Sequence, residues 1–196
     1  YHIYDEGGIV NTADGLYDAF SWSHGFKNYF AAKALPNPSV LASLKKKGMG
    51  ADCSSLPELI LAQSVGMTGE EIMCTSNNTP KNEMIYAHKI GAILNLDDIT
   101  FIDFLEKSVE KFPEMVCFRY NPGPLREGNA IIGKPEEAKY GVTREQLFDA
   151  YKIAKQTGAK RFGLHTMIAS NEINPDYFVE TGKMLFELAR DLYRET

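Results

Sequence analysis

Hydrophobic and polar positions follow two patterns along this chain, one typical of amphipathic helices and one typical of short buried strands. Apolar residues at helical spacing run over 5–20, and short apolar segments bounded by Gly or Pro recur after it. The pattern predicts strands over 29–33, 50–53, 71–75, 92–96, 114–120 and 161–166. It predicts helices over 5–20, 40–47, 55–65, 80–89, 98–111, 143–156 and 175–190, with an extended segment over 1–4 and a long Gly- and Pro-rich loop over 121–142.

Strands that alternate with helices of this length predict βαβ units and a parallel sheet. A spacing of about 20 residues per unit favours a (β/α) barrel over a doubly wound sheet, and a complete barrel has eight units and roughly 250 residues. The chain holds six such units. We therefore expect an α/β fold, a partial (β/α)8 TIM-type barrel, with residues 1–27 leading into a barrel portion over 28–196. Ser39 is the expected N-cap of the helix over 40–47.

Composition narrows the class of protein. The 196 residues are 44% hydrophobic and 24% charged, which is typical of a globular domain. With 21 basic and 26 acidic residues the net charge is -5, which disfavours a nucleic-acid partner. No apolar run approaches the roughly 18 residues of a membrane helix. The three cysteines show neither zinc spacing nor a disulfide framework, so we expect no metal and a reducing cytoplasm. Because the chain starts at Tyr1 rather than Met, we expect a processed or truncated piece.

Polar residues follow the predicted strands at their carboxyl ends, where barrels carry their active sites. They offer amine, carboxylate, amide, guanidinium and imidazole groups, a mixture expected of a polar site rather than of a packed rim. These residues are Lys33, Asp52, Ser76, Asn77, Asp97, Arg119 and His165.

Each residue of this rim also has a structural interpretation. Lys33 follows an apolar strand, and its amine fits a snorkelling side chain as well as a Schiff-base lysine. On spacing alone, Asp52 is better explained as an N-cap or turn carboxylate. Arg119 suits a planar acceptor such as a carboxylate or a phenolic oxygen, or an ion pair with Asp52 or Asp97. His165 is a candidate site residue only because it lies on the same rim.

The remaining polar and cysteine positions are less specific. Ser170 and Asn171 follow the last predicted strand and suit a helix cap or an anion site. No histidine is placed to activate Cys53 or Cys74, so both are expected to be small buried residues. No P-loop, dinucleotide fingerprint or HExxH helix is present.

Six segments, in order, resemble the alanine-racemase-like (fold type III) pyridoxal-phosphate decarboxylases, and most of all their diaminopimelate decarboxylase branch. The segments are YFAAKALPNPSVL, GMGADCSSLPEL, IMCTSNNTPK, CFRYNPG, AKYGV and GLHTMIASNE. Each is weak alone, but their order and spacing across almost the whole chain make the resemblance specific.

The resemblance implies roles for particular residues. Lys33 would hold pyridoxal 5'-phosphate through its amine, and Asp52 and Arg119 would position that lysine and the cofactor ring. Ser170 would help to bind the phosphate, and His165 would line the pocket. Asn77 and Asn121 would lie near the substrate or behind the groups that touch it.

The chain departs from the family pattern in two ways. Where the family usually has a histidine that stacks on the cofactor, this chain has Met167, whose thioether can pack on a ring but cannot donate a proton. The family also continues with a glycine-rich phosphate loop and a C-terminal β-domain, which these 196 residues lack. We therefore expect an N-terminal portion that is inactive alone.

The resemblance implies an amino-acid decarboxylase, with conversion of meso-2,6-diaminopimelate to L-lysine and carbon dioxide as the first hypothesis. Such an enzyme is expected to be a homodimer that takes a small amino-acid substrate. The alternatives are a non-catalytic relative that kept the fold as a cofactor-binding or regulatory protein, and a carboxynorspermidine decarboxylase.

Overall fold

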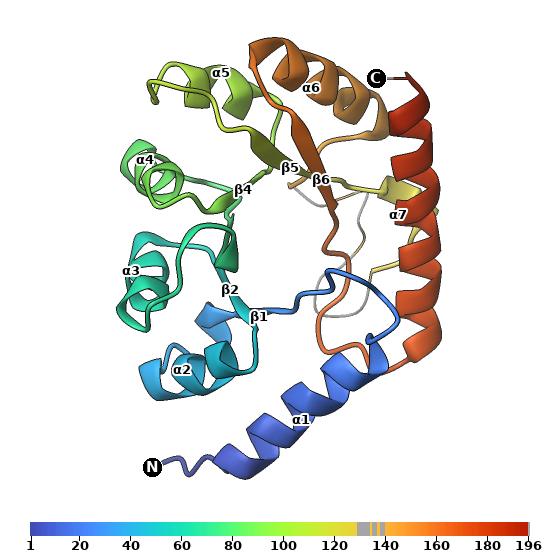
Figure 1. The fold of residues 1–196 in the computed structure, drawn as a ribbon. Helices are drawn as coiled ribbons and strands as arrows, with labels where there is room; N and C mark the ends of the chain where they lie inside the picture. The colour runs from blue at the N-terminus through green and yellow to red at the C-terminus, as the bar shows by residue number, and fades with distance from the viewer. Residues whose placement is uncertain (129–133, 135–136, 138–139, 196) are drawn as a thin grey trace. The chain divides into compact units, whose positions relative to one another are not determined.

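The computed structural model describes residues 1–128, 134, 137 and 140–195. The chain divides into two compact units, Tyr1–Ile93 and Leu94–Thr196. In both units parallel strands alternate with helices (Figure 1). The sequence predicted a different division, between residues 1–27, which lead into the barrel, and the barrel portion over 28–196. That division stays a prediction.

The first unit begins with a helix and continues as three βα repeats. Strand β1 pairs with β2 and β2 with β3, always in parallel, and helices α2, α3 and α4 lie along one side of these strands (Figure 1). Two short 3-10 helices, Ala32–Ala34 and Gly69–Glu71, interrupt the pattern. The elements are α1 (Glu6–Ala19), β1 (Tyr29–Ala31), α2 (Pro38–Lys46), β2 (Gly50–Cys53), α3 (Leu56–Ser64), β3 (Ile72–Thr75) and α4 (Lys81–Lys89).

The second unit repeats this plan. Strand β5 pairs in parallel with β4 and with β6, and a single bridge between Tyr120 and Val142 prolongs the edge of β5. A 3-10 helix, Gly123–Leu125, follows β5. The elements are β4 (Ile93–Leu96), α5 (Thr100–Glu106), β5 (Met115–Arg119), α6 (Arg144–Thr157), β6 (Arg161–His165) and α7 (Pro175–Glu195).

Local signals in the sequence fix the helix ends. The side chain of Asn37 accepts hydrogen bonds from the amides of Ser39 and Val40, and Pro38 occupies the first turn of α2. Asn37, not Ser39, is therefore the N-cap, and the prediction of Ser39 was wrong by two residues. Helix α6 begins with a capping box in which Thr143 and Gln146 satisfy each other's amides, and it ends at Gly158 with φ +129°.

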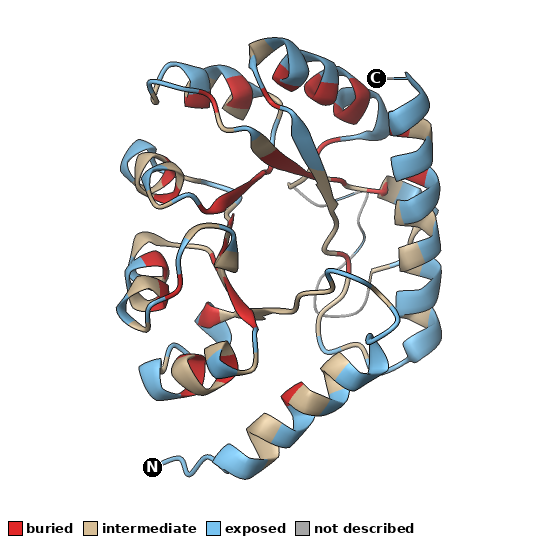
Figure 2. Ribbon diagram, in the orientation of Figure 1, coloured by how far each residue is buried: buried red, intermediate tan, exposed pale blue. Residues whose placement is uncertain are grey.

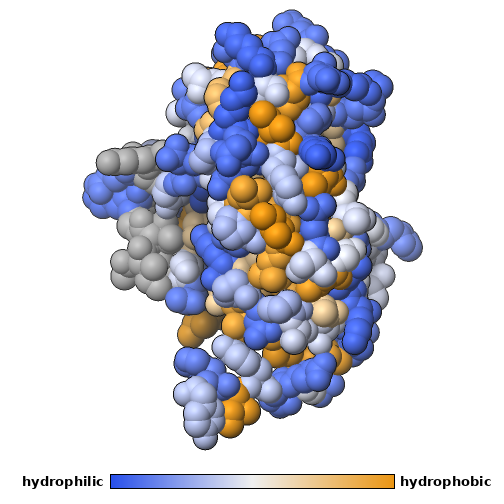
Figure 3. All heavy atoms as spheres, turned by 90° about the vertical axis from the view of Figure 1, so that its left-hand side faces the viewer, coloured by the Kyte–Doolittle hydropathy of each residue, from blue (hydrophilic) through white to orange (hydrophobic). Residues whose placement is uncertain are grey.

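Helix faces and strands bury a common layer in each unit. In Figure 2 the buried positions lie on the helix sides that face the strands, and the outward sides are exposed. Strand β4 is buried at all four positions, as expected for a parallel strand covered on both faces. The outer surfaces of the helices mix hydrophobic with hydrophilic side chains (Figure 3). Among the described helices, none has the length and apolar run needed to cross a membrane.

Several elements begin or end at other residues than the sequence predicted. Strand β1 ends at Ala31, and Lys33 lies in the 3-10 turn that follows rather than in the strand. Helix α5 ends at Glu106 rather than near residue 111, and just beyond it the Ser108 hydroxyl donates back to the Phe104 carbonyl at 2.6 Å. Such side-chain to backbone bonds compete with helix continuation.

We predict that Leu59→Ala destabilises the chain by about 2–5 kcal/mol, because Leu59 is fully buried on the strand-facing side of α3 and its truncation leaves a cavity. Urea unfolding followed by circular dichroism measures the change. Its neighbour Ile60, 49% exposed, is the matched control, and Ile60→Ala should cost less than about 1 kcal/mol. Equal losses for the two variants would contradict the packing described for α3.

Candidate active site

Lys33 stands at the carboxyl end of β1, in the turn over Ala32–Ala34. Its neighbour Ala32 is fully buried, which anchors the turn, whereas Lys33 itself is exposed. Within the described part of the chain, the Lys33 ammonium forms no hydrogen bond or ion pair. An amine that is anchored through its backbone and free at its tip is available for covalent chemistry.

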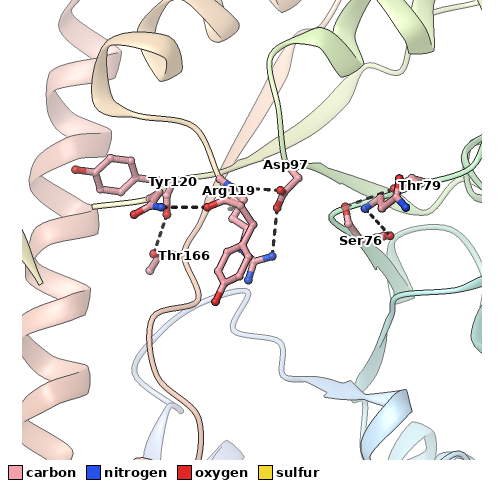
Figure 4. A network of polar contacts seen from close by, with 10 residues as sticks. Ser76, Thr79, Asp97, Arg119, Tyr120 and Thr166 are labelled. Carbon is pink, nitrogen blue, oxygen red and sulfur yellow. Dashed lines mark hydrogen bonds and ion pairs between the residues drawn. The ribbon is translucent and has the colours of Figure 1, made fainter. Parts of the chain in front are cut away.

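Asp52 lies inside β2, and the strand register sets it opposite Ala31 of β1. The carboxylate is therefore on the neighbouring strand, at the same strand end as the turn that holds Lys33. The preferred interpretation of Asp52 as an N-cap or turn residue was wrong, because the N-cap of α3 is Ser55. Asn77 is exposed in the loop after β3. In the same loop, the Ser76 hydroxyl and carbonyl bond to the Asn78 amide and the Thr79 hydroxyl (Figure 4).

In the second unit, the end of β4 meets the end of β5 through an ion pair. Asp97 Oδ1 accepts a hydrogen bond from Arg119 Nη1 at 3.2 Å (Figure 4). The two side chains are only 7% and 11% exposed, so both charges are largely removed from water. Of the two partners that the sequence suggested for Arg119, the structure selects Asp97.

The segment that precedes α6 returns to the end of β5 and contacts this ion pair. The Gly141 amide donates to Asp97 Oδ2 at 3.2 Å, and the Arg119 guanidinium lies 4.3 Å from the centre of the Tyr140 ring. The Asn121 side-chain amide donates to the Tyr140 carbonyl at 3.2 Å. Burial raises the pKa of Asp97, and the Gly141 amide and Arg119 oppose that rise. Lys139, in the AKYGV segment, lies outside the described residues.

His165 ends β6, and the register sets it opposite Arg119. Its carbonyl accepts a hydrogen bond from the Tyr120 amide at 2.7 Å, while the Thr166 hydroxyl donates to the Tyr120 carbonyl at 2.9 Å. Burial lowers the pKa of His165 to about 4, and the positive charge of Arg119 adds to that effect. The ring is therefore neutral at physiological pH. Its Nδ1 atom is buried and has no hydrogen-bond partner among the described residues.

The segment after β6 carries the remaining predicted residues. Met167 and Ser170 are half-buried, and Asn171 adopts the left-handed conformation with φ +54°. At the start of α7 the Asn174 side chain accepts from the Asp176 amide, so neither Ser170 nor Asn171 provides that contact.

In the first unit, burial raises the pKa of Cys53 and Cys74 to about 12, which agrees with inert thiols.

Sequence comparison identifies the family. The model of the pyridoxal-dependent decarboxylase pyridoxal-binding domain matches residues 11–193. The chain belongs to this family. The pyridoxal-binding domain of the family uses pyridoxal phosphate, so the cofactor that the resemblance implied is confirmed at the level of the family.

Individual relatives agree with this assignment. The chain is 37% identical over 195 residues to protein TabA of Pseudomonas amygdali pv. tabaci, covering all of this chain and 45% of that protein. It is 29% identical to diaminopimelate decarboxylase of Methanothermobacter thermautotrophicus, covering all of this chain and 46% of that protein. An ornithine decarboxylase of Nicotiana glauca is 25% identical over 98% of this chain and 43% of that protein. The chain thus spans about half the length of the curated relatives that it matches.

Solved structures confirm the fold class. The diaminopimelate decarboxylase of M. jannaschii has a TM-score of 0.86 and 23% identity, over 97% of this chain and 47% of that one. The enzyme of Helicobacter pylori, solved with L-lysine, has a TM-score of 0.82 and 22% identity, over 97% of this chain and 50% of that one. The fold is α/β with parallel strands, a partial (β/α) barrel, as predicted.

Each unit holds side chains whose chemistry suits a pyridoxal cofactor. Lys33 supplies an exposed amine, and His165 supplies a neutral ring whose buried Nδ1 atom lacks a partner in the described chain. The Arg119 guanidinium has five N–H donors, and its ion pair with Asp97 uses Nη1. The Arg119 guanidinium therefore keeps further N–H groups that can donate to another acceptor.

Sequence reasoning missed the parts played by Tyr140 and Gly141. Both belong to the AKYGV segment that carried the resemblance, but nothing in the spacing tied them to residues about twenty and forty positions away. The available signal was an aromatic residue followed by glycine directly before a helix start. Gly141 has φ +87°, and an added Cβ atom would lie 3.2 Å or less from the backbone of Arg119 and Asn121.

We predict that acid destabilises the fold through His165. Its pKa is about 4 in the folded chain against about 6.5 when unfolded, so the unfolded chain binds the extra proton between these values. Stability should therefore fall as pH drops from 6.5 to 4, by about 3 kcal/mol from this group. Urea unfolding at several pH values measures the free energy of unfolding. In His165→Asn this free energy should fall less between pH 6.5 and 4 than in the unmodified chain. The exposed His24 is the control, and an equal change of slope in His24→Asn would contradict the assignment.

Proposed function

We propose that this chain provides the cofactor-attachment portion of an amino-acid decarboxylase. Family membership over residues 11–193 carries the proposal, together with the exposed amine of Lys33 at the end of β1. Because the chain spans about half of its relatives' length, the activity of the whole protein remains a proposal.

Lys33 is the proposed attachment point for pyridoxal phosphate. The turn after β1 holds its backbone, and no partner within the described chain competes for its amine. Asp52, opposite Ala31 on β2, is proposed to position this lysine. Asn77, exposed after β3, and Asn121, which bonds to the Tyr140 carbonyl, are proposed to act on the substrate side.

Arg119, His165, Met167 and Ser170 are the proposed contributors of the second unit. Arg119 presents a fixed guanidinium to an anionic or phenolic oxygen of the cofactor. His165 is proposed to line the cofactor pocket as a neutral ring, because burial lowers its pKa to about 4. Met167 is proposed to pack its sulfur on the cofactor ring, and Ser170 to donate to the phosphate.

Bound pyridoxal phosphate supplies an electron sink for the pair of electrons left at an amino acid's α-carbon when carbon dioxide departs. The chain's own residues then orient the cofactor and the substrate and exclude water from them. Lys33 is proposed to hold the cofactor before the substrate arrives and to return a proton to the α-carbon afterwards. The Arg119–Asp97 pair keeps a positive group fixed without a surrounding solvent shell.

The first candidate substrate is meso-2,6-diaminopimelate, which would yield L-lysine and carbon dioxide. Several diaminopimelate decarboxylases among the relatives support it, with 25–29% identity over most of the chain. The higher identity to TabA leaves the substrate class open to a related amino acid, including that of a carboxynorspermidine decarboxylase. The other alternative is a non-catalytic relative. A cytoplasmic homodimer is the proposed assembly.

We predict that borohydride traps pyridoxal phosphate on Lys33. Reduction in the presence of the cofactor, followed by peptide mass spectrometry, should locate the adduct on this residue, and Lys33→Ala should lose it. Lys46→Ala, which removes an exposed lysine at the end of α2, should leave it intact. An adduct that persists in Lys33→Ala would refute the attachment point. The absence of any adduct in the natural protein would favour the non-catalytic relative.

We predict release of carbon dioxide from meso-diaminopimelate by the natural full-length protein, and little or none by these 196 residues alone. Assays with carboxyl-labelled diaminopimelate, ornithine and arginine separate the candidates. Lys33→Ala should lower the rate at least 100-fold, because removing a covalent catalytic group has effects of that order or larger. Faster turnover of ornithine than of diaminopimelate would overturn the substrate assignment while leaving the decarboxylase class intact.

A further inference from the structure

The Asp97 carboxylate divides its two oxygens between two different parts of the second unit. Oδ1 accepts from the Arg119 guanidinium at 3.2 Å, and Oδ2 accepts from the Gly141 amide at 3.2 Å. One buried carboxylate therefore ties the end of β5 to the segment that returns before α6. The proposed function uses Arg119 directly and treats Asp97 only as the charge partner of that arginine.

Arg119 is restrained on several sides at once. One face of its guanidinium lies against the Tyr140 ring, 4.3 Å from the ring centre. Its carbonyl accepts from the Val142 amide at 2.8 Å, so the backbone is fixed as well. The remaining freedom of the side chain is rotation of the guanidinium in its own plane. Asp97 restricts this rotation by accepting a hydrogen bond from Nη1.

Stability alone is a poor explanation for this ion pair. Taking two charges out of water costs about as much as their attraction returns, and apolar replacements of buried pairs are often as stable. A pair built for stability alone is also expected to be bidentate, because two parallel N–H···O bonds are stronger. Here the contact runs through Nη1 while the second oxygen of Asp97 is committed to Gly141.

We propose that Asp97 is a positioning residue that acts through Arg119, holding the free edge of the guanidinium in the orientation that contacts the cofactor. The inference rests on the proposed function, because it concerns how Arg119 meets pyridoxal phosphate. Asp97 itself touches Arg119 and Gly141, and it acts on the cofactor only through the arginine.

A double-mutant cycle on cofactor affinity tests this proposal in the natural full-length protein. The dissociation constant of pyridoxal phosphate is measured by equilibrium dialysis for Asp97→Asn, Arg119→Gln and the double variant. We expect Asp97→Asn to raise the constant about tenfold, the order of one charge-assisted hydrogen bond. In the Arg119→Gln background the same change should raise it less than about twofold, because residues that act as a unit are not additive.

The matched control is Asp103→Asn, which removes a carboxylate from an exposed ion pair with Lys107 and should leave the constant unchanged. Should Asp97→Asn fail to fold, Asp97→Glu retains the charge, displaces the guanidinium by one methylene, and enters the same cycle. Multiplicative effects in the double variant, or no effect of either Asp97 variant, would overturn the positioning role. Failure of the unmodified protein to bind pyridoxal phosphate would instead overturn the proposed function itself, and with it this role.

Discussion

The arrangement of the second unit depends on one buried charge pair. Asp97 and Arg119 are almost completely removed from water, and each would be costly to bury without the other. Once the pair is formed, its remaining contacts follow. The second carboxylate oxygen requires a donor, which the Gly141 amide provides, and the flat face of the guanidinium requires a cover, which the Tyr140 ring provides. The long connection after β5 is thereby closed where it returns to the strand.

The same pair sets the electrostatics next to it. His165, opposite Arg119 in the strand register, is half-buried and lies close to a positive charge, so protonation is disfavoured by desolvation and by the charge of Arg119. A neutral imidazole and a fixed guanidinium at adjacent strand ends suit the recognition of a planar, anionic group. Lys33 belongs to the other unit and differs in character, because it is exposed and its backbone alone is anchored.

Much of the fold was predictable from the sequence, because short apolar segments and glycine stops repeat at a regular interval. Strand β2 was predicted at its observed bounds, and Gly158 was recognised as the end of α6. Predictions failed at the ends of elements. Asn37 rather than Ser39 caps α2, and the turn after β1 carries Lys33 out of the strand. The contacts of Tyr140 and Gly141 depend on long-range closure of a loop, which no local pattern encodes.

The central proposal is that Lys33 attaches pyridoxal phosphate and that Arg119, held by Asp97, donates to an oxygen of the cofactor. The most direct test is a crystal structure of the natural protein grown with pyridoxal phosphate. We expect continuous electron density from Lys33 Nζ into the cofactor, with Arg119 still paired to Asp97 and a guanidinium N–H within hydrogen-bond distance of a cofactor oxygen. Density that joins the cofactor to another lysine, or a cofactor bound away from Arg119, would contradict it.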